Sequence, residues 1–166
     1  IIKDFPDVKF VWVGEGELTQ YLNDKVREYG VEQQVLFVGY RSNIPKWLKS
    51  ADLFVFPTHY EGHPFALLEA MANNLPIVTS NASAIPELIE HQVHGLLFRT
   101  GDSCDLRENL RWALKNPDIM QKIAQNAQLR VKDFSEEKMS QETIMILRQI
   151  SCDLSIETLT SVDAHQ

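Results

Sequence analysis

The sequence predicts an α/β fold, in which helices cover a doubly wound parallel sheet and a helical extension follows at the C-terminus. Up to residue 98, short apolar runs rich in β-branched and aromatic residues alternate with helical segments, and the links between them are short. Strands and helices in this order form right-handed βαβ units, which build a parallel sheet with helices on both faces. From Asp102 onward, apolar residues recur at helical spacing.

The first half of the chain is expected to supply three strands and two helices. A near-continuous apolar run over residues 8–13 predicts a strand buried on both faces, as in parallel sheets. Residues 18–29 have helical spacing, and Gly30 suits the C-terminal cap of that helix. The other expected elements are strands over 35–38 and 53–56 and a helix over 44–51, entered at Ser42-Asn43 with Trp47 and Leu48 facing inward.

The stretch from residue 53 to residue 79 predicts strand, turn, helix and strand. Gly62 permits a sharp turn, and Pro64 fits a first helical turn because it has no amide hydrogen. The free amides of Phe65, Ala66 and Leu67 would then point out of the helix N-terminus. That geometry binds anions and suits phosphate.

The remaining elements are predicted by turn residues and caps. Ser83 is expected to be the N-cap of a short helix that has Pro86 in its first turn. A last strand is expected over 94–98, and helices follow with breaks at Asn116-Pro117 and at 133–135. We expect residues 1–150 to form the domain and residues 151–166, which show little pattern, to be a disordered tail.

Composition and length fit one domain with a proper core. The chain has 166 residues, of which 44% are hydrophobic, and a formal net charge of −7. This charge argues against nucleic-acid binding but not against a small phosphorylated ligand. There is no apolar run of membrane-spanning length and no signal-peptide pattern. The first residue is Ile, so we expect the chain to start inside a longer protein.

The predicted site lies where four loops follow predicted strands, at residues 14–16, 39–41, 58–65 and 80–84. The carboxyl ends of parallel strands meet at one edge of a sheet, and ligands bind in the crevice outside that edge. Two carboxylates bracket the third loop, with Glu61 at its mouth and Glu69 inside the helix that follows.

Each of these signals has a structural alternative. Gly14 and Gly16 form either a ligand-facing turn or a structural one, since the full dinucleotide fingerprint needs a glycine where Thr19 stands. Arg41 either reaches an anion or a base or lies free on the surface, and His63 either contacts phosphate or sugar or caps a helix. Carboxylates at helix ends are also common as solvated or capping groups.

Several chemistries are not indicated. His91 and His94 are three residues apart but have no carboxylate or cysteine at matching spacing, so no metal site is expected. The two cysteines, Cys104 and Cys152, form neither a disulfide framework nor a metal-ligand spacing. The sequence contains no nucleophile elbow and no P-loop.

In combination, these segments resemble the C-terminal, Rossmann-like half of retaining glycosyltransferases of the GT-B fold. The likeness is greatest to the large group 1 family (family four of the sugar-nucleotide transferases) and covers residues 8–132. Glu61 and Glu69 match the Glu-x7-Glu motif of that family. The segments that carry the resemblance are 11–16, 35–40, 51–57, 61–72, 75–78, 85–89 and 95–98.

The resemblance implies a role for each site residue. Glu61 would contact hydroxyls of the donor sugar and stabilise an oxocarbenium-like transition state, and Glu69 would bind the ribose hydroxyls. The helix N-terminus, from His63 and Pro64 through the amides of Phe65, Ala66 and Leu67, would hold the distal phosphate. The remaining positions are Tyr40 and Arg41, which would flank the base, and Gly14 and Gly16, which would let the backbone pass close to the donor.

The resemblance further implies retaining transfer of a hexose from a nucleotide diphosphate sugar, such as UDP- or GDP-hexose, without a metal. The acceptor would be a saccharide or lipid-linked glycan in polysaccharide, lipopolysaccharide or glycolipid assembly. The phosphate-binding Arg and Lys of the family and its acceptor-binding N-terminal domain lie upstream of residue 1. We therefore expect this chain alone to bind nucleotide weakly and to be inactive. A cytoplasmic location is expected, with peripheral membrane association left open.

There are three alternatives to this function. One is another GT-B activity, similar to that of glycogen or sucrose synthases. A second is a non-catalytic nucleotide-binding or interaction module with a doubly wound fold, against which the intact Glu61 and Glu69 argue. A response-regulator receiver would need acidic residues after its first strands and a lysine after a later one, and the sequence lacks that set.

Overall fold

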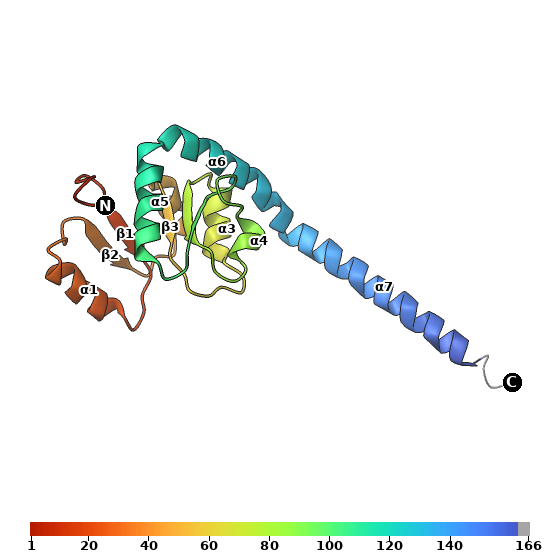
Figure 1. Cartoon of the computed structure of the whole chain (residues 1–166). Helices are drawn as coiled ribbons and strands as arrows, with labels where there is room; N and C mark the ends of the chain where they lie inside the picture. Colours follow the sequence, from red (N-terminus) through yellow and green to blue (C-terminus); the bar gives the residue numbers. More distant parts are fainter. Residues whose placement is uncertain (163–166) are drawn as a thin grey trace.

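The computed structural model describes the backbone of residues 1–162 and the side chains of residues 1–150. Strands and helices alternate as predicted before a helical C-terminal region (Figure 1). The elements are β1 (Phe10–Val13), α1 (Thr19–Glu28), β2 (Val35–Gly39), α2 (Ile44–Ser50), β3 (Phe54–Phe56), α3 (Phe65–Ala72), β4 (Ile77–Ser80), α4 (Ile85–Leu88), β5 (Leu96–Phe98), α5 (Ser103–Lys115), α6 (Pro117–Arg130), the 3-10 helix η1 (Val131–Phe134) and α7 (Glu136–Val162).

All ladder pairs between these strands are parallel, which confirms the predicted βαβ architecture. The strands form two groups, a pair β1-β2 and a three-stranded sheet in the order β3-β4-β5. Because β4 lies in the middle of its sheet, all four of its residues are buried.

Helices cover both faces of the three-stranded sheet, as expected for a doubly wound fold. Alternate residues of a strand point to opposite faces, so Ile77 and Val78 of β4 belong to different cores. Ile77 packs with residues of α2, α3 and α4, whereas Val78 packs with residues of α5. Helix α6 contributes to both cores, with Ala127 in the first and Ile123 in the second.

The β1-β2 pair differs from the prediction that the first strand is buried on both faces. Val11 and Trp12 of β1 are 44% and 49% exposed, so that prediction is wrong for β1. The reason is that β1 pairs only with β2 among the described strands, and α1 between them contains no buried residue. The Trp12 and Phe37 rings still pack against each other, with their centroids 6.1 Å apart.

Most of the predicted helix ends are confirmed by their capping geometry. Gly30 follows α1 with a φ of 64°, the left-handed conformation that suits glycine. Asn43 is the N-cap of α2, and its side chain accepts a hydrogen bond from the Lys46 amide. Asp102 caps α5 in the same way through the amides of Cys104 and Asp105. Ser135 stands before α7 and accepts from the Lys138 amide.

The N-cap predicted for the short helix α4 is wrong. Ala84 occupies the cap position, and its side chain forms no capping bond. Ser83 lies one residue earlier with a φ of 43°, so the chain turns sharply before the helix begins. Pro86 does lie in the first turn, as predicted.

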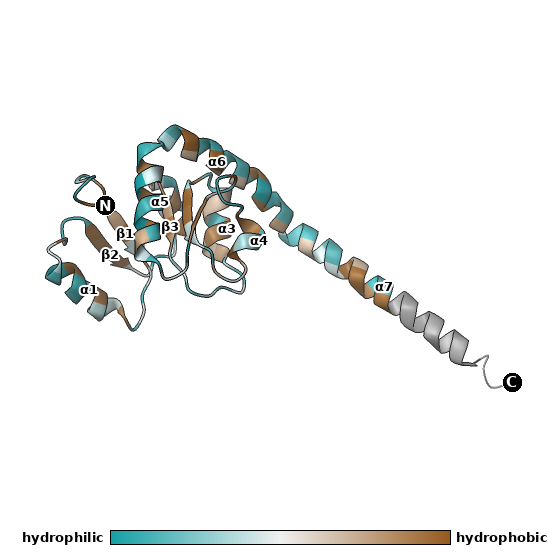
Figure 2. Ribbon diagram, viewed as in Figure 1, coloured by the Kyte–Doolittle hydropathy of each residue, from teal (hydrophilic) through white to brown (hydrophobic). Residues whose placement is uncertain are grey.

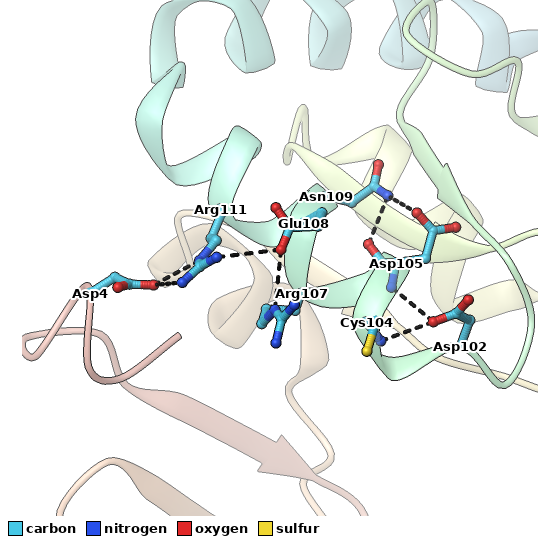
Figure 3. A network of polar contacts seen from close by, with 8 residues as sticks. All are labelled: Asp4, Asp102, Cys104, Asp105, Arg107, Glu108, Asn109 and Arg111. Carbon is cyan, nitrogen blue, oxygen red and sulfur yellow. Dashed lines mark hydrogen bonds and ion pairs between the residues drawn. The ribbon is translucent and has the colours of Figure 1, made fainter.

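Polar contacts along α5 attach the N-terminal residues to the second core (Figure 3). The Arg111 Nε donates to Asp4 Oδ2 at 2.7 Å, and Arg111 Nη1 lies 3.3 Å from Glu108 Oε1. The hydrogen bond from Arg111 lowers the pKa of the Asp4 carboxyl. These side chains are well solvated, so we expect the ion pairs to orient the segment more than to stabilise it.

Helix α7 projects away from the rest of the chain (Figure 1). Its residues 144–147 are a run of exposed apolar side chains, which forms a hydrophobic band in the middle of the helix (Figure 2). The helix continues to Val162 through part of the tail for which disorder was predicted, and the sequence from 151 to 162 contains no Gly or Pro that would stop it. Residues 163–166 of that tail lie outside the described residues. No helix within residues 1–162 is long and apolar enough to cross a membrane.

A methionine pair tests how much the first core contributes. Met71 on α3 is fully buried, so Met71→Ala should lower the free energy of unfolding by about 2–5 kcal/mol through lost transfer energy and a cavity. Met145 on α7 is 68% exposed, so Met145→Ala is the matched control, and its effect should stay within about 0.5 kcal/mol. Urea denaturation monitored by circular dichroism measures both, and equal effects would contradict the core assignment.

Candidate functional site

The candidate site consists of the four loops that follow β1, β2, β3 and β4, and we call it the loop edge. Its residues are 14–18, 40–43, 57–64 and 81–84. Two of these loops are hydrogen-bonded to the end of the neighbouring strand, the first loop to β2 and the third loop to β4. The Gly14 amide donates to the Gly39 carbonyl at 2.9 Å, and the Ser80 hydroxyl donates to the Thr58 carbonyl at 2.6 Å.

The first loop depends on a glycine at one of its two glycine positions. Gly14 has a φ of 128°, which other residues rarely adopt, whereas Gly16 is not in the positive region. Thr19 stands where the dinucleotide fingerprint has a third glycine, and its hydroxyl donates to the Gly16 carbonyl at 2.7 Å. The loop is therefore closed by a side-chain bond of its own.

Glu15, which the sequence did not predict as a site residue, connects the first loop to the second. Glu15 Oε1 accepts a hydrogen bond from the Tyr40 amide at 3.0 Å. Gly39 has a φ of 69°, a left-handed conformation that favours glycine, and a Cβ there would lie 2.9 Å from the same oxygen, so the Glu15 side chain would have to shift. A glutamate between two glycines gives no local signal of a partner 25 residues away.

Tyr40 and Arg41 form the tip of the second loop. The Tyr40 side chain is 70% exposed, and Arg41 Nη1 donates to the Tyr40 carbonyl at 2.8 Å. Arg41 forms no ion pair with any described residue, so its guanidinium charge is not neutralised within this part of the chain. It is also the only Lys or Arg in the four loops, which contain the three acids Glu15, Glu17 and Glu61.

The two predicted carboxylates lie at the two ends of one turn and helix. Glu61 is half-buried, and its Oε1 accepts from the Thr58 hydroxyl at 3.0 Å. Glu69 is exposed on α3, and within residues 1–150 neither carboxylate pairs with a cation. Carboxylates without a counter-charge are suited to accept hydrogen bonds from hydroxyl groups of a ligand.

The helix N-terminus presents fewer free amides than the sequence predicted. Pro64 is buried at the N-cap, and α3 begins at Phe65. The Phe65 amide donates to the His63 carbonyl at 2.9 Å and the Leu67 amide to the Pro64 carbonyl at 3.0 Å. Of the three predicted amides, only that of Ala66 has no acceptor in the part of the chain that the structure describes. The tight turn at Pro64 is the reason, because it closes short-range bonds.

Aromatic side chains project from the loop edge and its helix. The side chains of Tyr40, Tyr60 and Phe65 are 70%, 78% and 70% exposed. The rings of His63 and Phe65 pack edge-to-face, with their centroids 4.6 Å apart. Aromatic side chains elsewhere on the chain are exposed as well, such as Tyr21 at 57% and Tyr29 at 70%, so exposure alone does not mark the loop edge as a binding surface.

Two hollows lie away from the loop edge. One, of about 750 Å³, lies between residues 4–5 and α5, and another, of about 400 Å³, lies beside Leu75 and Pro76 where the chain enters β4. Neither contains a predicted site residue. Neither hollow therefore coincides with the predicted site.

Two histidines have structural contacts beside β5. His91 Nδ1 accepts from the Leu97 amide at 2.9 Å, and His94 Nδ1 accepts from the Glu90 amide at 3.3 Å. Burial, and then the nearby Arg130 charge, lower the pKa of His94, against the opposing effect of Glu90. Among the described residues, no three His, Cys, Asp or Glu side chains lie close enough together to hold a metal ion.

Comparison with known proteins gives one matching family. The sequence model described as "Glycosyl transferases group 1" matches residues 1–130. An Escherichia coli protein described as "UDP-Gal:alpha-D-GlcNAc-diphosphoundecaprenol alpha-1,3-galactosyltransferase" is 38% identical over 101 residues, which are 58% of this chain and 25% of that protein.

Two solved structures are similar as well. Anabaena Alr3699/HepE in complex with UDP-glucose is 28% identical, with a TM-score of 0.73 over 90% of this chain and 41% of that one. The C-terminal domain of the glycosyl transferase group 1 protein LpcC from Francisella tularensis is 29% identical, with a TM-score of 0.71. The match covers 79% of this chain and 71% of that one. This chain spans 40%, 25% and 37% of the length of three curated relatives that it matches.

The Glu15 contact can be tested by amide hydrogen exchange. Glu15→Ala removes the acceptor of the Tyr40 amide, so that amide should exchange about tenfold faster, as expected when a bond to a charged group is lost. Glu17→Ala is the matched control, because Glu17 forms no side-chain bond to any described residue and should leave the Tyr40 amide unchanged. The same rate at Tyr40 in both variants would show that Glu15 does not tie the loops.

Protonation of His94 should destabilise the fold. The folded pKa of His94 lies below its unfolded value of about 6.5, so the unfolded state binds the proton more readily. The free energy of unfolding should therefore show no loss from His94 above about pH 6.5, and it should decrease as the pH falls below that value. Denaturation at pH 7.5 and pH 5.5 should show this loss, and His94→Gln should reduce it. His63→Gln, which changes an exposed histidine, is the control and should leave the pH dependence unchanged.

Proposed function

We propose that this chain, which belongs to the group 1 glycosyl transferases, forms the donor-binding half of a hexosyltransferase. The proposed ligand is a nucleotide diphosphate sugar, bound at the loop edge. The observation that carries the proposal is the turn and helix between Glu61 and Glu69. These carboxylates have no cationic partner among the described residues, and the α3 N-terminus lies between them in the sequence.

The arrangement suits the separate parts of such a donor. Ribose and hexose offer hydroxyl donors to Glu69 and Glu61, and an ionised carboxylate accepts two hydroxyls well. The α3 N-terminus, with the free amide of Ala66, faces the phosphate with the positive end of the helix dipole. Tyr40 supplies an exposed ring, and Arg41 a free guanidinium, beside the base.

In this proposal Glu61 is the catalytic residue. Positive charge develops on the sugar ring as the bond to the leaving phosphate breaks, and a carboxylate held at that ring stabilises the charge. The α3 N-terminus stabilises the nucleotide diphosphate that leaves. We propose retention of configuration, no metal, and an acceptor that is a saccharide or lipid-linked glycan used in polysaccharide or glycolipid synthesis.

The chain alone should bind the donor weakly and transfer nothing. The three acids of the four loops outnumber the single Arg41, so the phosphate charge is poorly neutralised here. The Escherichia coli relative is about four times longer than its matched portion, and we propose that a further domain of the intact protein supplies cations and binds the acceptor. We also propose that the intact protein works in the cytoplasm, against the inner face of the membrane.

Nucleotide titration tests the proposal. UDP, GDP and ADP are titrated into the chain and followed by calorimetry and amide chemical shifts. One of them should bind with a millimolar or tighter Kd, and Glu69→Ala should weaken it about tenfold or more, since the ribose loses bonds to a charged acceptor. The shift changes should include Tyr40, Arg41 and Ala66.

The matched control is Glu142→Ala, which removes an exposed carboxylate from α7 and should leave the Kd unchanged. Equal weakening by both variants would contradict ribose binding at Glu69, and it would not be an effect of net charge, because the loss of a carboxylate should strengthen the binding of an anion. If no nucleotide binds even when the upstream residues of the intact protein are restored, the donor site is assigned wrongly, and the chain is better described as a non-catalytic module with a doubly wound fold.

A further inference from the structure

A chain of hydroxyl contacts runs from the buried end of β4 to Glu61. Thr79 and Ser80 are fully buried, and their hydroxyls donate to the Phe56 carbonyl at 3.1 Å and the Thr58 carbonyl at 2.6 Å. The Thr58 hydroxyl in turn lies 3.0 Å from Glu61 Oε1. The position of Glu61 is therefore linked to the core of the sheet through side chains, and not only through the loop backbone.

The Thr58 hydroxyl has two possible acceptors but one hydrogen. It lies 3.0 Å from Glu61 Oε1 and 3.2 Å from the Tyr60 carbonyl. A bond to an ionised carboxylate is about twice as strong as one to a neutral carbonyl, and here it is also the shorter. The hydrogen is therefore directed mainly at Glu61.

We infer that Thr58 is a positioning residue for Glu61, an inference that rests on the proposed function of this site. The Thr58 hydroxyl holds Oε1 and so fixes the rotation of the carboxylate about its long side chain. Oε2 then keeps its lone pairs free and is the atom that accepts a hydroxyl of the donor sugar. Without Thr58, Glu61 would sample several rotamers and would meet the sugar in only some of them.

A merely structural role for Thr58 makes a different prediction. If its hydroxyl served only the Tyr60 carbonyl, removing it would disturb the turn but not the order of the Glu61 side chain in particular. Thr58→Val removes the hydroxyl and keeps the branched shape, whereas Thr58→Ser keeps the hydroxyl and removes a methyl group. The two variants therefore separate the bond from the packing.

The first experiment needs no ligand. The ¹³C relaxation of the Glu61 side-chain methylenes is measured in the original chain, Thr58→Val, Thr58→Ser and the control Thr143→Val. Thr143 is a fair control because its hydroxyl donates to the Met139 carbonyl on α7. We expect the order parameter of Glu61 to fall from about 0.8 to below about 0.6 in Thr58→Val only. Thermal unfolding of each variant checks that it is folded.

The second experiment compares UDP with UDP-glucose as probes. Thr58→Val should weaken UDP-glucose about threefold to tenfold and leave the Kd of UDP unchanged, because only the sugar reaches Glu61. Thr58→Ser should restore most of the affinity for UDP-glucose. A variant that weakened both probes equally would contradict a role confined to the sugar.

The outcomes separate the two proposals. An unchanged Glu61 order parameter in folded Thr58→Val, or an equal loss in Thr58→Ser, overturns the positioning role whatever binds. A loss in Thr58→Val alone, in a chain that binds no nucleotide even with its upstream residues restored, supports the positioning of Glu61 and overturns the proposed donor site.

Discussion

The complete burial of β4 is the constraint on which the rest of the structure depends. Its four residues are inaccessible to solvent because β3 and β5 flank it and helices cover both of its faces. The side chain of Ile77 lies in the first core, and that of Val78 lies in the second. The last two residues, Thr79 and Ser80, are polar, and a buried hydroxyl without a partner is costly. Thr79 donates to the carbonyl of Phe56, the last residue of β3, and Ser80 to that of Thr58 in the loop that follows. The strand that organises the core thus also fixes the loop that carries Glu61.

The two groups of strands differ in how deeply their side chains are buried. The β3-β4-β5 sheet is covered on both faces, whereas β1 and β2 leave Val11, Trp12 and Leu36 about half exposed. The Glu15–Tyr40 bond joins the two loops of the smaller group to each other, and the Asp4–Arg111 pair connects the residues before β1 to α5. The Asp4–Arg111 pair lies between solvated side chains and contributes little stability. The loops after β1 and β2 are therefore held less firmly than those after β3 and β4.

The sequence predicted what local chemistry determines. Helices begin at a capping side chain, as at Asn43 and Asp102, or end at a glycine, as at Gly30, and short apolar runs predicted all five strands. What it did not predict depends on contacts between distant residues. The exposure of β1 follows from which strands are its neighbours, and the bond of Glu15 from the approach of Tyr40. The amides at the start of α3 depend on how tightly the chain turns at Pro64, which the presence of a proline does not fix. The placement of Glu61 and Glu69 against a donor remains a prediction.

The charge of the loop edge explains why a partial site of this kind should discriminate sugars better than it binds phosphate. A diphosphate carries about two negative charges, and at a surface each uncompensated carboxylate a few ångströms away opposes it by an energy on the order of 1 kcal/mol. The four loops contain Arg41 against Glu15, Glu17 and Glu61, and the adjoining first turn of α3 adds the Ala66 amide. Glu15 accepts a hydrogen bond from the Tyr40 amide, and Glu61 accepts one from the Thr58 hydroxyl. Part of the negative charge is therefore stabilised by neutral donors of the protein itself. Hydroxyl groups do not suffer this repulsion and bind such oxygens directly. Under the proposed function, this chain by itself would therefore recognise mainly the ribose and hexose hydroxyls, and strong binding of the phosphates would require more cations than Arg41, the one Lys or Arg of the four loops.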